Sequence, residues 1–517
     1  MVTLLPMGER AVLAEVADLA AVLALHAALD ADVLDGVDDL VPAARTVLVV
    51  FDPARVSSES IGSWVLRAAG RAPDAIAPGP LVEVPVRYDG ADLDSTAELL
   101  GIPVPDLVSR HAGVEWTVAF TGFAPGFAYL VSADWPFDVP RLAEPRTRVP
   151  AGAVGLAGGF SGAYPRETPG GWRLIGTTDA VLFNPDAADP VLLPPRARVR
   201  FVPERVRLTA ASASTEAAEP VGASPVAASS AASRPVLRID SPGGATTVQD
   251  LGRPGRAALG VARSGALDRA ALRIANRLVG NAEGAAALEI TMGGFAARAE
   301  TDTWACATGA LADVTVDGRA VDAYAPVLVP AGAELRIGAP RAGLRAYLAV
   351  RGGILAPMAL GSRARDVLAG LGPAPLTAGE ELSVGEPASA VPTVDSFPWT
   401  VPPPSIDVLI APGPRADWFA PGALDTLADT AWSVSPHADR VGIRLDGPAL
   451  DRRRHDELPS EGMRPGAIQV PPHGRPVVLL ADGPVTGGYP VIAVVSDAAL
   501  DALAQVRPGD HVRFRRV

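Results

Sequence analysis

The feature that most constrains this chain is a block of sequence that occurs twice, on either side of a low-complexity spacer. Both copies consist of short apolar runs separated by Pro-Gly, Gly-Gly and Tyr-Pro pairs. Gly and Pro interrupt helices and supply turns, so the block predicts two related β-barrel-like units. Three pairs of segments correspond between the copies: 149–154 with 464–468, 161–165 with 486–490, and 198–201 with 511–514.

The rest of the chain divides by its hydrophobic pattern. Strand-like runs at 11–16 and 46–51 alternate with helical stretches that Asp18 and Asp52 can cap, which predicts an α/β sandwich. A further helix is expected at 268–279. The predicted fold class is mainly β with a small N-terminal α/β sandwich. The expected parts are 1–80, this sandwich; 81–205, the first barrel; 209–234, a flexible Ala/Ser linker; 235–385, the first β-rich part of the second half; 386–405, a Pro-rich spacer; and 406–517, the second barrel.

Charge and residue usage exclude several classes of function. The net charge of −13 argues against a nucleic-acid or anionic-membrane partner. None of the 45 basic residues is lysine, so P-loop, Schiff-base and biotinyl-lysine chemistry are excluded and anions must be held by arginine or backbone N–H groups. The single cysteine, Cys306, allows no intrachain disulfide and is expected to be buried. No apolar run reaches the roughly 18 residues of a membrane span, and we expect a cytoplasmic protein.

Candidate site residues in the first half lie in segments rich in glycine and polar side chains. His111 is a candidate catalytic residue, and the segment 122–129 places glycines beside aromatic rings, which lets backbone N–H groups approach a ligand. A tightly packed β-arch is the alternative interpretation of that segment. The binding candidates there are Gly122, Phe123, Gly126, Tyr129 and, within the repeated block, Tyr164.

Two arginines of the first half form a separate candidate. Arg146 and Arg148 lie two apart on a strand-like stretch, so their side chains face the same side. A pair of guanidinium groups suits an anion, although a solvated strand edge is equally compatible with the pattern.

In the second half, polar residues gather before the helix at 268–279. Asp250, Arg253, Ser264 and Asp268 precede this helix and Asn276 lies on it. A helix N-terminus offers free N–H donors to an anion, and ordinary capping is the alternative. Mg²⁺ prefers carboxylates with phosphate oxygens, so Asp250, Asp268, Asp439 and Glu461 are the acids to test. Asp250, Asp268 and Glu461 are the acidic catalytic candidates, and no metal ligand set is assigned. The remaining binding candidates are Arg351, Arg363, Arg440, Arg444, Gln469 and Tyr489.

Taken together, these segments resemble two known families. Residues 1–205 are similar to the allophanate hydrolase subunit 1 family, also known as the 5-oxoprolinase B subunit, which includes bacterial histidine-kinase inhibitors. The shared motifs are at 111–113, 122–130, 149–152, 164–165 and 169–172. Residues 236–517 resemble the subunit 2 family, also known as the 5-oxoprolinase C subunit, with motifs at 247–253, 264–268, 275–276, 288–289, 351–353, 439–442, 469–471 and 486–490. The resemblance implies cyclophilin-like β-barrel domains in both halves.

The resemblance also implies a function. The B and C subunits act with a separate A subunit in the ATP-dependent opening of 5-oxoproline to glutamate, in which phosphorylation of the lactam oxygen lets water attack. ATP and Mg²⁺ are the implied cofactors, and biotin is not expected on this chain. We expect the two halves to pack against each other around a shared, arginine-lined cavity that contains Arg146, Arg253 and Asp268.

Two alternatives remain open from the same residues. The two modules also resemble the carboxyltransferase region of urea carboxylase and urea amidolyase. The other alternative is a non-catalytic regulator that binds a histidine kinase, because the sequence shows no recognisable pair of acid and base catalysts. The chain departs from the families at Phe160, at Ala364-Arg365 and at 483–485, where polar groups are replaced.

Overall fold

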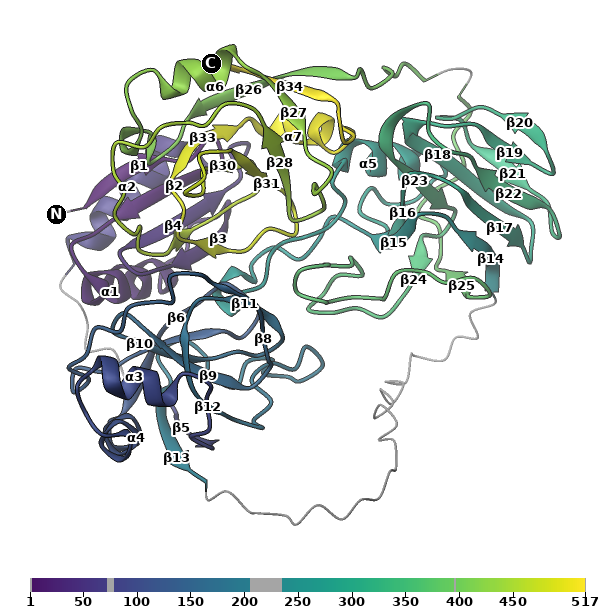
Figure 1. Ribbon diagram of the computed structural model, residues 1–517. Helices are drawn as coiled ribbons and strands as arrows, with labels where there is room; N and C mark the ends of the chain where they lie inside the picture. The colour runs from purple at the N-terminus through teal and green to yellow at the C-terminus, as the bar shows by residue number, and fades with distance from the viewer. Residues whose placement is uncertain (1, 72–78, 205–234, 395–396, 517) are drawn as a thin grey trace, which may run out of the picture.

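The structure is a computed structural model that describes residues 2–71, 79–204, 235–394 and 397–516. The chain forms four packed units, shown in Figure 1: an N-terminal α/β unit, a first barrel, a β-sandwich and a second barrel. The expected linker at 209–234 lies outside the described residues.

The N-terminal unit is the predicted α/β sandwich. Its four-stranded antiparallel sheet has one face covered by two helices, and Asp18 caps the first of them through the Ala21 N–H, as predicted. The second helix begins with Ser57 as its cap, five residues later than expected, because the Asp52 carboxylate instead accepts the Ala54 N–H in a separate turn. In spatial order the strands are β1 (Thr3–Pro6), β2 (Ala11–Glu15), β4 (Thr46–Phe51) and β3 (Val37–Pro42), and the helices are α1 (Leu19–Asp30) and α2 (Ser58–Ala69).

The first barrel occupies 81–203. Its seven-stranded sheet curls until an isolated bridge between Arg87 and Thr177 joins the two edges. In spatial order the strands are β5 (Leu81–Val86), β13 (Arg198–Pro203), β6 (Trp116–Thr121), β7 (Ala128–Val131), β10 (Phe160–Ala163), β9 (Ala153–Ala157) and β12 (Arg173–Thr177). The unit is completed by the ribbon of β8 (Arg146–Val149) and β11 (Thr168–Gly170) and by the helices α3 (Leu93–Leu99) and α4 (Val104–Gly113).

The second barrel is closed and occupies 405–516. In spatial order its strands are β26 (Ser405–Pro412), β34 (His511–Arg516), β27 (Ala431–Val434), β28 (Gly442–Asp446), β31 (Val477–Leu479), β30 (Ala467–Gln469) and β33 (Val491–Val495). The unit also contains the ribbon of β29 (Glu461–Gly462) and β32 (Thr486–Gly487) and the helices α6 (Ala423–Asp429) and α7 (Asp497–Leu503).

The two barrels have the same topology, which confirms the duplication predicted from the repeated block. In each barrel the first strand pairs in parallel with the last, β5 with β13 and β26 with β34. The remaining strands follow in the same circular order, and each ribbon joins a strand before the fourth barrel strand to one before the sixth. The turns that lead into β9 and β30 also correspond, with Gly152 and Gly466 at φ of 79° and 89°.

One of the three predicted segment pairs is wrong. Residues 161–165 begin on β10, whereas 486–490 begin on β32 and lead into β33, so the two Tyr-Pro pairs occupy different places in the barrels. The counterpart of 487–489 is 170–172, because both segments connect the ribbon to the sixth barrel strand. The repeated unit in this region is therefore Gly-Gly-aromatic.

The part between the barrels is a β-sandwich of two sheets with an apolar core between them. The predicted helix is present as α5 (Arg269–Leu278), with Asp268 as its cap, and packs on the five-stranded sheet. Cys306 is buried in this unit as expected, and burial raises the pKa of its thiol to about 12. The seven-stranded sheet contains β20 (Arg319–Val321), β19 (Val314–Val316), β22 (Glu334–Ile337), β17 (Phe295–Ala299), β14 (Pro235–Pro242), β25 (Glu381–Val384) and β24 (Ile354–Leu355). The five-stranded sheet contains β15 (Ala245–Gln249), β16 (Ala287–Thr291), β23 (Ala342–Val350), β18 (Thr303–Leu311) and β21 (Val327–Val329).

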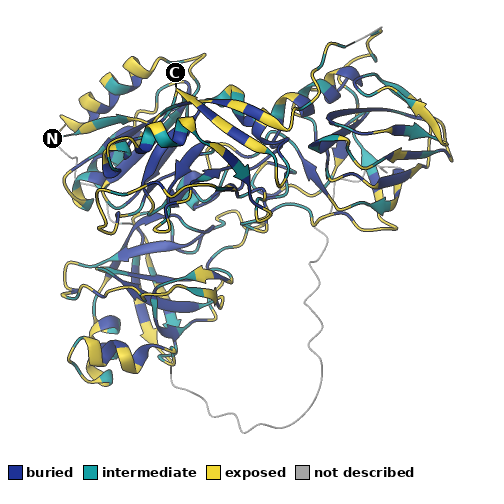
Figure 2. Ribbon diagram, turned by 45° about the horizontal axis from the view of Figure 1, so that its top comes forward, coloured by how far each residue is buried: buried dark blue, intermediate teal, exposed yellow. Residues whose placement is uncertain are grey.

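The two halves of the chain pack against each other. The face of the N-terminal sheet that the helices leave uncovered packs on the second barrel, where Leu13 and Leu48 join a buried cluster with Met463 and Val494. Figure 1 shows the purple N-terminal strands beside the yellow-green second barrel, and in Figure 2 the strands of this region are mostly dark blue. The expectation that the halves pack against each other is therefore confirmed. No helix among the described residues has the length and apolarity needed to cross a membrane.

Candidate functional site

A cavity of about 300 Å³ lies between the two barrels. Both halves of the chain contribute to its walls, so neither barrel contains the site alone. Its lining from the first barrel is Phe123, Phe127, Tyr129, Arg141, Tyr164, Gly170, Gly171 and Trp172. Its lining from the second barrel is Glu457, Ser460, Gln469, Pro484, Thr486, Gly487, Gly488 and Tyr489.

Equivalent segments of the two barrels face each other across this cavity. The Gly-Gly-aromatic segments at 170–172 and 487–489 both line it. Arg141, from the connection between β7 and β8, forms an ion pair of 3.1 Å with Glu457, from the equivalent connection between β28 and β29. The two barrels therefore contact each other partly through corresponding segments.

The close approach of the barrels depends on a glycine. The N–H of Phe123, which has a φ of 65°, donates a hydrogen bond of 2.9 Å to Oγ1 of Thr486. A Cβ atom on Gly122 would lie 2.2 Å from the same oxygen. Only glycine fits there, which explains the dense Gly and aromatic pattern of 122–129.

The inner wall of the cavity is aromatic. The ring of Phe127 lies edge-on to Tyr129, Tyr164 and Trp172, with centroids 5.1, 5.0 and 5.2 Å apart. Burial raises the pKa of both tyrosine hydroxyls, so they stay protonated and can donate hydrogen bonds. Phe160, one of the departures from the families, packs against Tyr129 from outside the cavity lining, at 5.6 Å between ring centroids.

This arrangement suits a small, flat ligand with polar edges. Aromatic faces bind planar groups and exclude water, while the side chain of Gln469 and the tyrosine hydroxyls supply hydrogen bonds. The charged pair Arg141 and Glu457 is half-exposed, at 42% and 65% of the side-chain surface, so charge is confined to the rim.

Five of the predicted site residues line this cavity. They are Phe123, Tyr129, Tyr164, Gln469 and Tyr489. Gly122 and Gly126 shape the loop that carries Phe123, and the N–H of Gly126 donates to the Leu259 carbonyl at 2.9 Å. Arg141 and Glu457 were not predicted, and Trp172 and Thr486 were identified only as members of family motifs. The two Gly-Gly-aromatic copies, each directly before a strand, were the signal for Trp172.

The cavity between the barrels does not have the predicted arginine lining. Its described lining contains one arginine, Arg141, and none of Arg146, Arg253 and Asp268. Arg146 pairs with Asp92 at 2.6 Å, and the exposed Arg148 pairs with Glu167. These two arginines therefore bind their own barrel.

His111 is not positioned for catalysis. It is fully buried in the first barrel, where Tyr88 Oη lies 2.7 Å from its Nδ1 and Ser161 Oγ lies 2.8 Å from its Nε2. Its ring stacks on Phe201 at 4.5 Å, and burial lowers the pKa of the imidazole to about 3. Both ring nitrogens of His111 therefore have partners inside the barrel.

Several predicted residues of the second half instead join the β-sandwich to the second barrel. The buried guanidinium of Arg440 donates to Glu289 at 2.5 Å and to Asp482 at 2.9 Å. Ser264 Oγ also donates to Asp482, at 2.6 Å. Asp268 accepts from Gln505 of the second barrel at 2.7 Å, and burial raises the pKa of its carboxyl to about 6.

The other predicted residues shape loops. Asp250 accepts from Ser362 Oγ and the Arg363 N–H, and the buried Arg253 donates to the Ala359 carbonyl at 3.2 Å. The hydrogen bonds of these side chains stabilise the loops that support α5, and the side chains do not form a binding site. Of the remaining three, Asn276 donates to the Ala285 carbonyl, Arg351 to the Val279 carbonyl, and Arg444 is exposed on β28.

The acidic candidates do not fit a Mg²⁺–nucleotide site. Asp250 and Asp268 are engaged as described, Asp439 accepts the N–H groups of Val441 and Gly442 in a turn, and Glu461 accepts from Nε of Arg415 at 2.8 Å. Among the described residues no group of three or more His, Cys, Asp or Glu side chains could hold a metal ion.

Comparison with known proteins identifies the family. The model of the carboxyltransferase domain, subdomain A and B, matches residues 259–516, and that of subdomain C and D matches 2–193. The chain is 39% identical over 285 residues to the 5-oxoprolinase C subunit of Escherichia coli (strain K12), which covers 54% of this chain and 90% of that protein. It is 36% identical over 181 residues to the 5-oxoprolinase B subunit of Bacillus subtilis (strain 168), which covers 32% of this chain and 75% of that protein. The chain belongs to the 5-oxoprolinase B and C subunit families, fused in one polypeptide.

A solved structure has the same arrangement over the whole fusion. The crystal structure of TTHA0988 matches this B–C fusion with a TM-score of 0.85 at 35% identity, covering 98% of this chain and 99% of that one. Urea amidolyase of Lachancea kluyveri is 33% identical over 311 residues, which covers 54% of this chain but 17% of that protein.

Proposed function

We propose that this chain is the fused B and C component of an ATP-dependent 5-oxoprolinase and that it binds 5-oxoproline in the cavity between the barrels. The observation that supports the proposal is the cavity itself, which is walled by corresponding glycine and aromatic segments of both halves. A site assembled in this way requires both subunit types, as expected for a function that B and C perform together.

The chemistry of the lactam agrees with the cavity. A five-membered lactam is small and flat, so its ring can stack on Trp172 or Tyr129 while its amide group forms a hydrogen bond with the side chain of Gln469. Its carboxylate can pair with Arg141 at the rim, because that guanidinium is half-exposed and its partner Glu457 can turn to solvent. Holding the lactam oxygen in one position contributes to catalysis through orientation.

The proposal assigns the nucleotide to the separate A subunit. The acidic residues of this chain are used in caps and interdomain ion pairs, which leaves no described cluster for Mg²⁺. In this arrangement the chain binds and orients the lactam, and ATP with its Mg²⁺ approaches from the partner.

A carboxyltransferase is the second candidate. It is favoured by the family models, which carry that description, and by the match to urea amidolyase. Such an enzyme would take its carboxyl group from a biotin domain on another chain, since this chain has no lysine to carry biotin.

The test combines the purified chain with a homologue of the 5-oxoprolinase A subunit, 5-oxoproline and Mg-ATP, and measures ADP and glutamate together. We expect equimolar products that depend on both proteins, and a loss of at least about tenfold in kcat/KM on Trp172→Leu, a change of about 1.4 kcal/mol or more. Arg336→Gln, at an exposed arginine of β22 that does not line the cavity, is the control. ADP release that does not depend on 5-oxoproline contradicts the proposal. Carboxylation of urea or a related amide in the presence of a biotin-loaded partner supports the second candidate.

A further inference from the structure

A second cavity, of about 430 Å³, lies where the β-sandwich meets the second barrel. Its walls come from α5, from α7 and from the segment 397–403 that leads into β26. Figure 1 shows α5 and α7 beside each other at this junction. The volume falls in the range of pockets for small organic molecules, roughly 300–1,000 Å³. The cavity shares no described lining residue with the cavity between the barrels.

One wall of this cavity is aromatic. Tyr324 of the sandwich stacks on Trp399 and Phe397 of the connecting segment, with ring centroids 4.8 and 5.7 Å apart. Trp399 and Phe397 are only partly buried, so their rings keep surface that a ligand can cover. Ile274 and Ile406 extend the apolar lining. This wall suits the apolar body of a small molecule.

The cavity also contains a buried carboxylate. Asp268 is 8% exposed, and its two partners are uncharged: Oδ1 accepts from the Ala271 N–H at 2.8 Å and Oδ2 from Nε2 of Gln505 at 2.7 Å. Within the described structure no arginine forms an ion pair with it. Burial raises the pKa of its carboxyl to about 6, and the negative charge of Asp501 adds to this increase. An ionised carboxylate in such a place is stabilised by a cation.

The carboxylate and the aromatic wall belong to one site. Gln505, which donates to Asp268, lies close to Gly309, where an added Cβ atom would be 3.3 Å from Nε2 of Gln505. The N–H of Gly309 in turn donates to Oη of Tyr324 at 2.9 Å. Burial raises the pKa of the Tyr324 hydroxyl to about 12, and the charge of Asp268 contributes to the increase. One small ligand can therefore contact both the carboxylate and the rings.

A second carboxylate lies at the same end of α5. Oδ1 of Asp501, on α7, accepts the backbone N–H of Arg269 at 3.1 Å and Nε of the same residue at 3.2 Å. Arg269 directly follows Asp268, so the two carboxylates are neighbours, and both line the cavity. The described lining contains no arginine or histidine. The cavity is therefore acidic, and carboxylates already bind two N–H groups of this helix end, which disfavours an anion.

We propose that this cavity binds an organic cation, namely an ammonium group on a short chain that ends in a ring. The ammonium group donates charge-assisted hydrogen bonds to Asp268 and Asp501. The ring packs on Trp399 and Phe397. The bound cation supplies the positive charge that the protein does not place beside Asp268. The site does not depend on the proposed lactam chemistry.

The experiment titrates the full chain with 2-phenylethylamine by calorimetry at pH 8.0, where the carboxylate of Asp268 is ionised. The matched ligands are 2-phenylethanol and phenylacetate, which carry the same ring with a neutral and an anionic end. We expect one amine per chain and at least about tenfold weaker binding of both matched ligands. Trp399→Leu should weaken binding of the amine at least about fivefold, whereas Trp399→Phe keeps a ring and should change it less than about twofold.

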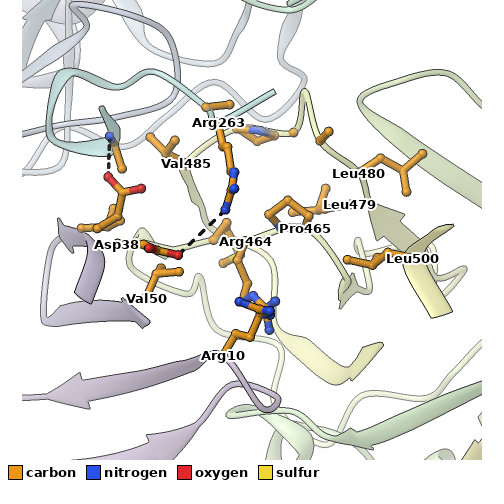
Figure 3. A pocket seen from close by; sticks show the side chains of 18 of the residues that line it. Arg10, Asp38, Val50, Arg263, Arg464, Pro465, Leu479, Leu480, Val485 and Leu500 are labelled. Carbon is orange, nitrogen blue, oxygen red and sulfur yellow. Dashed lines mark hydrogen bonds and ion pairs between the residues drawn. The ribbon is translucent and has the colours of Figure 1, made fainter. Parts of the chain in front are cut away.

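Asp501→Asn tests the charge, because asparagine keeps an acceptor for Arg269 but is neutral. We expect the affinity for the amine to fall at least about fivefold. Asp497→Asn is the matched control: Asp497 lies one turn earlier on α7, pairs with Arg269 at the same 3.2 Å and has a similar side-chain exposure, 20% against 24%. It lines another cavity, of about 110 Å³, in which Figure 3 shows Arg464 turned toward Arg10. This control should leave the affinity for the amine within about twofold.

Asp268→Asn removes the buried charge but places an amide against the donor of Gln505, so it is read only where its thermal unfolding shows a folded protein. It should then weaken binding of the amine at least about tenfold. No saturable binding of the amine, binding of 2-phenylethanol as tight as that of the amine, or equal losses in Asp501→Asn and Asp497→Asn overturns the proposal. These titrations contain neither 5-oxoproline nor an A subunit, so they can fail without affecting the lactam assay.

Discussion

Phe123 and Thr486 are 363 residues apart, yet the backbone N–H of the first donates to the hydroxyl of the second at 2.9 Å. The bond joins the two barrels at the edge of the cavity they enclose, and both residues line that cavity. The distance between the barrels and the shape of the site are therefore set by the same contact.

Removing this contact should destabilise the protein. Thr486→Ala leaves the Phe123 N–H without its partner, which costs about 1–3 kcal/mol, whereas Thr486→Ser keeps the oxygen and should cost less than about 1 kcal/mol. Urea unfolding monitored by tryptophan fluorescence measures both. Equal losses for the two variants would show that the methyl group, not the hydrogen bond, matters.

Tyr489 gives a test of the cavity that does not depend on stability. The residue is 43% exposed, so Tyr489→Ala should change the free energy of unfolding by less than about 0.5 kcal/mol. We expect kcat/KM in the 5-oxoprolinase assay to fall at least about tenfold. Leu409→Ala, 50% exposed on β26 of the same barrel and absent from the cavity lining, should leave activity unchanged.

His111 should act on stability and not on catalysis. Burial holds the pKa of its imidazole at about 3, below the unfolded value of 6.5, so the unfolded chain binds the proton first. Stability is then lost as the pH falls from about 6.5 toward 3. His111→Gln should remove this part of the pH dependence and cost about 1–3 kcal/mol at neutral pH, with kcat per folded molecule unchanged. A loss of kcat per folded molecule in His111→Gln would instead show a catalytic role for His111.

Asp366 should have the opposite pH dependence. It is fully buried, its Oδ2 has no hydrogen-bond partner within the described structure, and burial raises the pKa of its carboxyl to about 6. The folded state thus binds a proton more tightly than the unfolded chain, and stability falls as the pH rises from about 4 to 6. Asp366→Asn should stabilise the protein at pH 8 by about 1–3 kcal/mol and have little effect at pH 3. Asp446→Asn, at a half-exposed site, is the control for unfolding measured across this range.

The two halves should remain associated without a peptide link. Residues 1–204 and 235–517, expressed as separate chains, should co-elute in gel filtration because their apolar surfaces are mutually buried. Arg415 bridges them, contacting Glu15 of the first half at 3.0 Å and Glu461 of the second. Arg415→Met leaves two acids unpaired and should weaken the association at least about tenfold. Separate elution of the wild-type halves contradicts this account.

The elements of the fold were largely predictable because their signals are local. The run 46–51 became β4 with the same bounds, and Asp18 and Asp268 cap helices as their positions indicate. The start of α2 was missed because Asp52 and Ser57 are both good caps, and only the turn geometry selects Ser57.

The site was predictable only in part, for a physical reason. Glycines and aromatics of 122–129 can be recognised because a close backbone approach requires them. Charged residues carry no such signal, since a guanidinium suits an ion pair between domains as well as a ligand. Arg440 is such a case: its partners Glu289 and Asp482 are 151 and 42 positions away, and only the fold brings them together.

The packing of the N-terminal sheet on the second barrel has a consequence for synthesis. Leu48 leaves the ribosome about 400 residues before Met463, so at about 5–20 residues per second its apolar sheet face waits roughly 20–80 s for its cover. During that interval the nascent chain exposes an apolar surface that is prone to association with other chains. Joining both halves in one translated message guarantees that the covering barrel arrives in cis and in equal number.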